Sequence, residues 1–101
     1  MNIDQTFKLG INALKEKDLI EAEKIFNLLV AKDPNNSEFN HFLGITLQLL
    51  NKVNDAIIYY EKSIEINPKF SEAYKNLGNM FYRLGKIDEA EMNYKKSLEI
   101  D

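Results

Sequence analysis

The segment Tyr60–Asn67, with the sequence YEKSIEIN, returns in altered form at Tyr94–Asp101 as YKKSLEID. The two copies begin 34 residues apart, and five of their eight residues are identical. Self-similarity at a fixed period of this length is the signature of a repeat architecture, in which similar structural units stack on one another. The chain is therefore expected to contain one type of unit several times.

Three further series of residues follow the same period through all 101 residues. Each unit has a Leu-Gly pair, an alanine twelve residues after the glycine, and an aromatic residue four residues after that alanine. The first two units also end on a proline. We expect a single domain, 1–101, with repeats at about 3–36, 37–70 and 71–101. The residues are Leu9-Gly10, Ala22, Phe26 and Pro34; Leu43-Gly44, Ala56, Tyr60 and Pro68; and Leu77-Gly78, Ala90 and Tyr94.

Each unit is expected to form two helices. Leu43, Leu47 and Leu50 recur at spacings of three and four, which is the helical period, and the second half of the unit behaves in the same way. A glycine inside a helix costs about 1 kcal/mol relative to alanine. We therefore expect Gly44 to serve a close helix crossing, face to face with Ala56. A helix pair cannot bury its own apolar face, so the pairs stack.

The helix ends also carry recognisable signals. Hydroxyl or carboxylate side chains followed by an acid indicate helix N-termini. Residues that tolerate a left-handed backbone, chiefly glycine and asparagine, suit the turn between paired helices. The expected N-caps are Ser37, Ser71, Asp18 and Asp88, and the expected left-handed turn residues are Lys17, Asn51 and Gly85.

These residues resemble the tetratricopeptide repeat family over essentially the whole chain. The third copy follows the family pattern most closely, with Tyr74, Leu77-Gly78 and Phe81 in its first helix. The first copy is the loosest, with Thr6 where the family has an aromatic residue. The resemblance implies an all-α fold, a right-handed α-solenoid of three helix-turn-helix repeats with six antiparallel helices. It also implies a concave groove, lined by the first helix of each pair, that binds a segment of another protein.

The family pattern assigns five groove positions to each repeat. Apolar side chains dominate these positions in the first repeat and basic ones appear in the third, so we expect a peptide that is apolar over Phe7, Ile11 and Ile45 and acidic toward Lys75 and Arg83. The candidate groove residues are Phe7, Ile11, Leu14, His41, Ile45, Leu49, Lys75, Asn79, Tyr82 and Arg83, with Asp4, Lys15, Glu38, Gln48 and Glu72 completing the positions.

Two other interpretations of these residues stay open. Phe7 can pack into the core in place of the ring that Thr6 does not supply. Lys75 and Arg83 can form an ordinary solvated helix face. His41, the only histidine, has no second ligand or nucleophile at a suitable spacing, so a groove or surface position is favoured over a metal site.

One branch of the family does not match. Its chaperone co-factors bind acidic C-terminal tails through a clamp of one lysine, two asparagines and two further residues that are basic. None of the five corresponding positions agrees here, so this mode of recognition is not expected. Those positions hold Phe7, Ile11, Phe42, Glu72 and Asn76.

Composition excludes several other classes of function. The net charge is −3, which argues against binding of nucleic-acid backbones. There is no cysteine, no glycine-rich phosphate loop and no metal-ligand spacing. The N-terminus lacks the charged and apolar regions of a signal peptide, and no apolar stretch is long enough to span a membrane. We expect a cytoplasmic, non-catalytic module with no cofactor, no metal and no membrane insertion.

Three functions remain open from the sequence. The first is an adaptor that binds a protein or peptide in the concave groove. The second is self-assembly into a homo-oligomer, because the last expected helix has no further helix to cover Met92, Leu98 and Ile100. The third is the N-terminal recognition arm of a longer protein.

Overall fold

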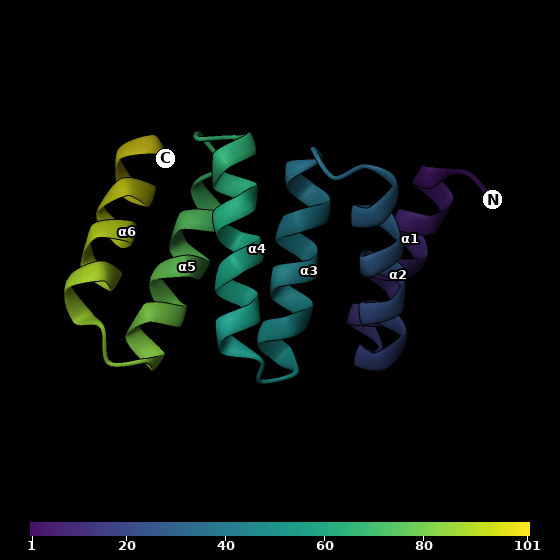
Figure 1. Cartoon of the computed structure of the whole chain (residues 1–101), viewed down its shortest axis with the longest axis horizontal. Helices are drawn as coiled ribbons and strands as arrows, with labels where there is room; N and C mark the ends of the chain where they lie inside the picture. The colour runs from purple at the N-terminus through teal and green to yellow at the C-terminus, as the bar shows by residue number, and fades with distance from the viewer.

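The computed structural model describes all 101 residues as six α-helices with no strand. Figure 1 shows the three helix pairs following one another along the long axis of the molecule, with the two termini at opposite ends of the array. The molecule measures 42 × 25 × 20 Å along its principal axes. The expected all-α solenoid of three helix pairs is confirmed. The helices are α1 (Ile3–Lys15), α2 (Leu19–Lys32), α3 (Ser37–Leu49), α4 (Val53–Ile66), α5 (Ser71–Arg83) and α6 (Ile87–Ile100).

Each helix packs against its neighbours in the chain. Contacts within a repeat join α1 to α2, α3 to α4 and α5 to α6, and contacts between repeats join α2 to α3 and α4 to α5. Among helices that are not consecutive, the main contact is between α3 and α5. The first helices of the second and third repeats therefore approach one another. None of the six helices is both long and apolar enough to cross a membrane.

The glycines lie where the ring of the second helix meets the first helix. A Cβ placed on Gly44 would stand 2.8 Å from the Tyr60 ring, and one on Gly78 would stand 2.7 Å from the Tyr94 ring. Gly10 and Phe26 repeat the arrangement at 2.7 Å. The expected close crossing is thus present in all three repeats. The atoms nearest to the Cβ position of each glycine are those of the ring, and in the third repeat the backbone carbonyl of Ala90 also approaches that position of Gly78, at 3.2 Å.

The turns within repeats agree with the sequence prediction. Lys17, Asn51 and Gly85 adopt φ values of 60°, 65° and 77°. The left-handed conformation lets the chain reverse within three residues, so that paired helices lie antiparallel. Lysine is the least suited of the three residues to this conformation, since its Cβ crowds the backbone there.

The N-cap predictions are only partly correct. Asp18 caps α2, and its carboxylate accepts a hydrogen bond from the Glu21 backbone N–H at 3.2 Å. Asp88 lies inside α6, whose N-cap residue, Lys86, makes no side-chain cap bond. Ser37 and Ser71 are the first helical residues, not the caps.

Those two serines instead take part in contacts between paired helices. The Ser63 hydroxyl donates to the Ser37 carbonyl at 2.9 Å, and the Ser97 hydroxyl donates to the Ser71 carbonyl at 3.0 Å. Asn36 performs the cap of α3, since its side chain accepts from the Phe39 backbone N–H. A serine-acid pair at a helix start is therefore compatible with two different roles.

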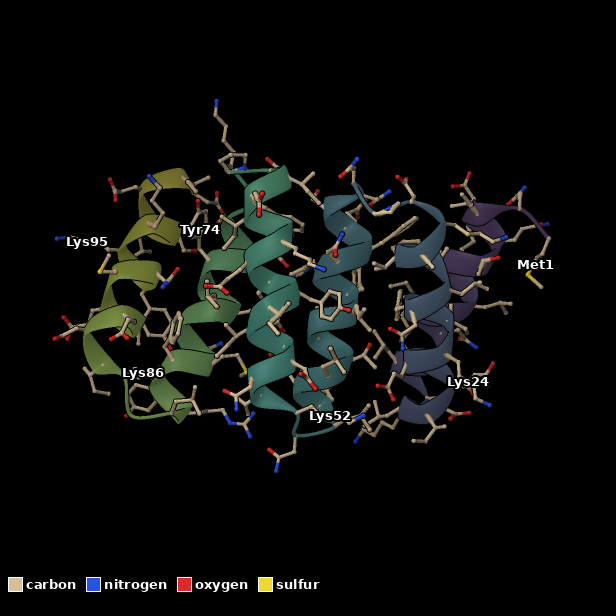
Figure 2. The ribbon with its side chains drawn as sticks, in the orientation of Figure 1. Met1, Lys24, Lys52, Tyr74, Lys86 and Lys95 are labelled. Atoms are coloured by element: carbon tan, nitrogen blue, oxygen red, sulfur yellow. The ribbon has the colours of Figure 1, made fainter.

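The two inter-repeat junctions are built from different contacts. The first junction gathers phenylalanine rings: Phe42 stacks on Phe26 with centroids 5.7 Å apart. Lys52 Nζ adds an ion pair with Glu23 at 3.1 Å across the same junction (Figure 2). Asn40 is fully buried there, and its amide donates to the Pro34 and Asn36 carbonyls. Asn40 thus ties the loop between repeats to α3 where the family has an aromatic residue.

The replacement Ala56→Leu tests the packing of α4 on α3. Ala56 is fully buried, so the larger side chain must displace its neighbours. We expect the free energy of unfolding to fall by roughly 1–3 kcal/mol, measured by urea denaturation. The control Asn54→Leu adds a leucine on the exposed face of the same helix and is expected to change stability by under about 0.5 kcal/mol. Equal effects of the two changes would contradict this assignment of helix faces.

Candidate functional site

The first helices carry the predicted groove residues, and most of these keep surface exposure. Lys75 and Arg83 are exposed, and Leu49 and Tyr82 expose 54% and 63% of their surface. The remaining apolar members, together with Asn79, are partly buried: Phe7, Ile11, Leu14 and Ile45. The predicted groove positions, which we call the stripe, therefore contain apolar surface on all three first helices. Two of these side chains, one on α3 and one on α5, are strongly exposed.

His41 does not line an open groove, so its assignment to that surface was wrong. Only 2% of its surface is exposed, and its ring packs against Phe70 with centroids 4.6 Å apart and against Tyr60 at 5.6 Å. Its Nε2 accepts a hydrogen bond from the Asn76 side chain, at 2.9 Å. His41 is a core residue at the junction between the second and third repeats.

The His41–Asn76 pair was not found from the sequence. The two residues occupy adjacent positions of successive repeats, 35 residues apart, so a search for such inter-repeat pairs would have found them. Burial lowers the pKa of His41 to about 4, although the Glu72 carboxylate opposes this shift. The ring is consequently neutral at physiological pH, which suits its role as a hydrogen-bond acceptor in an aromatic environment.

Phe7 packs against the core, which is one of the interpretations that the sequence left open. Its ring lies 5.5 Å from that of Phe39, 5.4 Å from Phe42 and 6.2 Å from Phe26. It therefore supplies the ring that Thr6 lacks. Part of Phe7 still reaches the surface, where it borders a hollow of about 370 Å³ on α1 that is also lined by Lys8, Ile11, Asn12 and Lys15.

Two polar members of the stripe are held by tyrosines of the second helices. Asn79 Oδ1 accepts from the Tyr94 hydroxyl at 2.6 Å, and Gln48 Oε1 accepts from the Tyr60 hydroxyl. Burial raises the pKa of the Tyr60 phenol above its ordinary value, so it remains a donor. These bonds fix the two amides and reduce their freedom to bind a ligand.

The charges of the stripe separate toward its two edges. Its acids, Asp4, Glu38 and Glu72, stand in the first turns of α1, α3 and α5. Lys15 and Arg83 stand in the last turns of α1 and α5. This distribution stabilises each helix dipole. It also leaves one acidic edge, one more basic edge and an apolar band between them.

No three His, Asp or Glu side chains lie close enough together to hold a metal ion. Two of the clamp positions considered above hold residues that make contacts within the protein. Phe42 packs against Phe26, and Asn76 is bonded to His41.

Family comparisons agree with this architecture. Models described as tetratricopeptide repeat match residues 37–70 and 71–101. The chain belongs to the tetratricopeptide repeat family. The first repeat, which departs most from the family pattern, lies outside the matched residues. A search of curated proteins by sequence finds no match.

Solved structures show the same fold. The crystal structure of MamA matches with a TM-score of 0.94 and 24% identity over 99% of this chain, which spans 58% of the MamA chain. The translocator chaperone SycD of Yersinia enterocolitica, solved with a peptide of the translocator YopD, gives 0.94 and 22% identity, covering 97% of this chain and 75% of that one. The second tetratricopeptide domain of Spaghetti (RPAP3), bound to the HSP90 peptide SRMEEVD, gives 0.92 and 20% identity, covering 96% and 90%.

The low pKa of His41 predicts acid sensitivity. The folded protein holds this pKa near 4, whereas an unfolded chain has about 6.5, so only the unfolded state binds the proton between these values. The contribution of the neutral His41 ring to the free energy of unfolding is therefore fully present above pH 6.5 and is lost as the pH falls from 6.5 toward 4. We expect a loss of about 2 kcal/mol between pH 7 and pH 5 in urea denaturation. The variant His41→Gln should remove most of this slope; an unchanged slope would assign the acid sensitivity to other groups.

Proposed function

We propose that the inner surface of α1, α3 and α5 binds a segment of another protein. The observation that carries this proposal is the apolar band on three consecutive first helices, which no element of the chain covers. Leu49 and Tyr82 are more than half exposed, and Ile11 and Ile45 are partly exposed beside them. Exposed apolar side chains bordered by charged residues are typical of a protein interaction site.

The composition of the band indicates the chemistry of the bound segment. Large apolar side chains of the segment would contact Ile11, Ile45 and Leu49. Acidic residues would lie toward Lys75 and Arg83 on α5, where both side chains are exposed. Arg83 also donates to the Asn51 side chain, which fixes its position at the end of the helix. The segment is thus apolar over the first two repeats and acidic over the third.

Structures of the same fold support a peptide in this role. SycD has been solved with a YopD peptide, and the Spaghetti domain with the HSP90 peptide SRMEEVD. The present chain lacks the clamp residues that would hold a terminal carboxylate, since Phe7 and Ile11 replace polar residues there. We therefore propose that this chain binds an internal, partly apolar segment of its partner and not a free acidic C-terminus.

The double replacement Ile11→Glu, Ile45→Glu tests the groove. The probes are fluorescein-labelled peptides with a Leu/Phe-rich half and an Asp/Glu-rich half, made in both orders, and the readout is fluorescence anisotropy. Two carboxylates on the apolar band should weaken the better-binding peptide by at least about tenfold, which corresponds to 1.4 kcal/mol. Circular dichroism checks that the variant remains helical.

The matched control is Ile20→Glu, Ile58→Glu. It places the same two substitutions on exposed positions of α2 and α4, on second helices. Affinity should remain within about threefold of the unmodified chain, because neither side chain belongs to the predicted groove positions. If both double variants bind alike, or if neither peptide order binds the unmodified protein, the groove is not the binding site.

The HSP90 peptide SRMEEVD provides a test of the missing clamp. A clamp recognises the terminal carboxylate, so a clamp-bearing protein loses affinity when that terminus is amidated. Here we expect the free acid and the amide to bind equally, within about threefold, in a direct titration. Strong preference for the free acid would show that carboxylate recognition occurs through residues other than the family clamp.

A further inference from the structure

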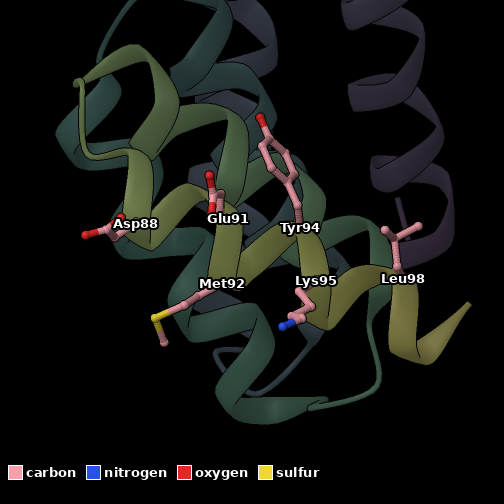
Figure 3. A pocket seen from close by; sticks show the side chains of 6 residues that line it. All are labelled: Asp88, Glu91, Met92, Tyr94, Lys95 and Leu98. Atoms are coloured by element: carbon pink, nitrogen blue, oxygen red, sulfur yellow. The ribbon is translucent and has the colours of Figure 1, made fainter.

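The outward face of α6 carries the other candidate interaction surface. Figure 3 shows its side chains along the helix, where they border a hollow of about 530 Å³. Met92 exposes 69% of its surface and Leu98 exposes 77%. We call this the α6 face; it consists of Asp88, Glu91, Met92, Tyr94, Lys95 and Leu98.

Half of this surface has a counterpart on α4 that is covered by a helix, whereas the counterparts of Asp88, Met92 and Lys95 on α4 are exposed. Residues 57, 60 and 64 of α4 correspond to 91, 94 and 98 of α6, and α5 packs against α4. Ile57 and Ile64 are partly buried against the core, whereas Leu98 is largely exposed. The helix that covers α4 runs antiparallel to it. The α6 face is therefore shaped to accept one further antiparallel helix.

The charges of the chain oppose head-to-tail stacking of copies on this face. Such a stack would place repeat one of a second copy where a fourth repeat would follow. By the 34-residue period, the contact between Lys52 and Glu23 would be replaced by one between Asp18 of the second copy and Glu91 of the first. The contact between Asn76 and His41 would be replaced by one between Lys8 of the second copy and Lys75 of the first. Both new pairs carry like charges, which are unfavourable at an interface.

The first helix also offers the wrong surface for such a stack. The positions that hold Phe39, Phe42 and Thr46 in α3 hold Gln5, Lys8 and Asn12 in α1, and all three are exposed. Polar side chains of α1 would have to be buried against Leu98 and Tyr94 without partners, at a cost in free energy. The two ends of the array are therefore not complementary to each other.

We propose that the α6 face binds the α6 face of a second copy, with the two helices antiparallel. Asp88, Glu91, Lys95 and Leu98 follow one another at spacings of three, four and three, which places them in one row along the helix. A two-fold axis midway between Glu91 and Lys95 sets each Glu91 opposite Lys95 of the second copy. The interface is isologous, so this attraction occurs twice.

The apolar residues of the face complete the contact. Met92 and Tyr94 flank the charged row. The same axis sets each Leu98 opposite Asp88 of the second copy, at the two ends of the contact, where Leu98 loses part of its exposure to water. One helix from each copy buries less area than a standard protein interface, so dimerisation depends on concentration in the measurable range. Growth stops at two copies because the α6 face is consumed, and the groove on α1, α3 and α5 stays free.

Charge exchange across the two-fold axis tests the dimer. Sedimentation velocity of the 101-residue chain, from about 10 µM to about 1 mM, should show a monomer–dimer equilibrium. Glu91→Lys and Lys95→Glu should each weaken it by at least about tenfold, because each brings like charges together twice. The double variant, Glu91→Lys with Lys95→Glu, should return to within about threefold of the original, because the opposite charges face each other again.

Controls separate this arrangement from its alternatives. Lys96→Glu reverses an exposed charge of α6 outside the face and should leave dimerisation unchanged. Lys8→Glu should also leave it unchanged, whereas tighter association with species larger than a dimer would establish head-to-tail stacking. A chain that is monomeric throughout, or a double variant that fails to recover, overturns the proposal. Peptide anisotropy of the α6 variants should match the unmodified chain, so failure of the groove is detected separately.

Discussion

The contact of a ring with the backbone of a glycine determines the geometry of this protein. In each repeat the ring of the second helix lies against the first helix where a Cβ would be less than 3 Å away, as Tyr60 does at Gly44. This contact fixes how far apart paired helices lie and how they cross. Because the same contact occurs three times, the three helix pairs share the same internal geometry, and they stack although the side chains at the two junctions differ. The inner surface of α1, α3 and α5 is a consequence of that stacking.

The sequence predicted the architecture well because the architecture depends on periodic local signals. The repeat length, the helix halves and the left-handed turns at Asn51 and Gly85 can each be read from a few neighbouring residues. Side-chain partners between repeats depend on the rotation between helix pairs, which no local pattern encodes. His41 was therefore placed on the groove, although the structure buries it against Phe70 and Asn76.

The candidate groove shows the same division between local and non-local information. The family pattern predicted which positions of α1, α3 and α5 form the groove, and nine of the ten residues named retain surface exposure. It could not show that Asn79 is held by the Tyr94 hydroxyl or that Phe7 joins a cluster of rings. These details depend on which larger or smaller residues the neighbouring repeats contribute. Phe7, for example, fills space that Thr6 leaves empty.

The two junctions of the array respond differently to protons. The first is made of phenylalanine rings and the Lys52–Glu23 ion pair, whereas the second contains a neutral imidazole whose Nδ1 is buried without a hydrogen-bond partner. In a linear array, cooperativity between units depends on each nearest-neighbour interface. Protonation of the imidazole would place a charge inside the second junction alone. In acid, the third repeat would therefore separate and melt before the first two, giving an ordered sequence of unfolding from the C-terminal end.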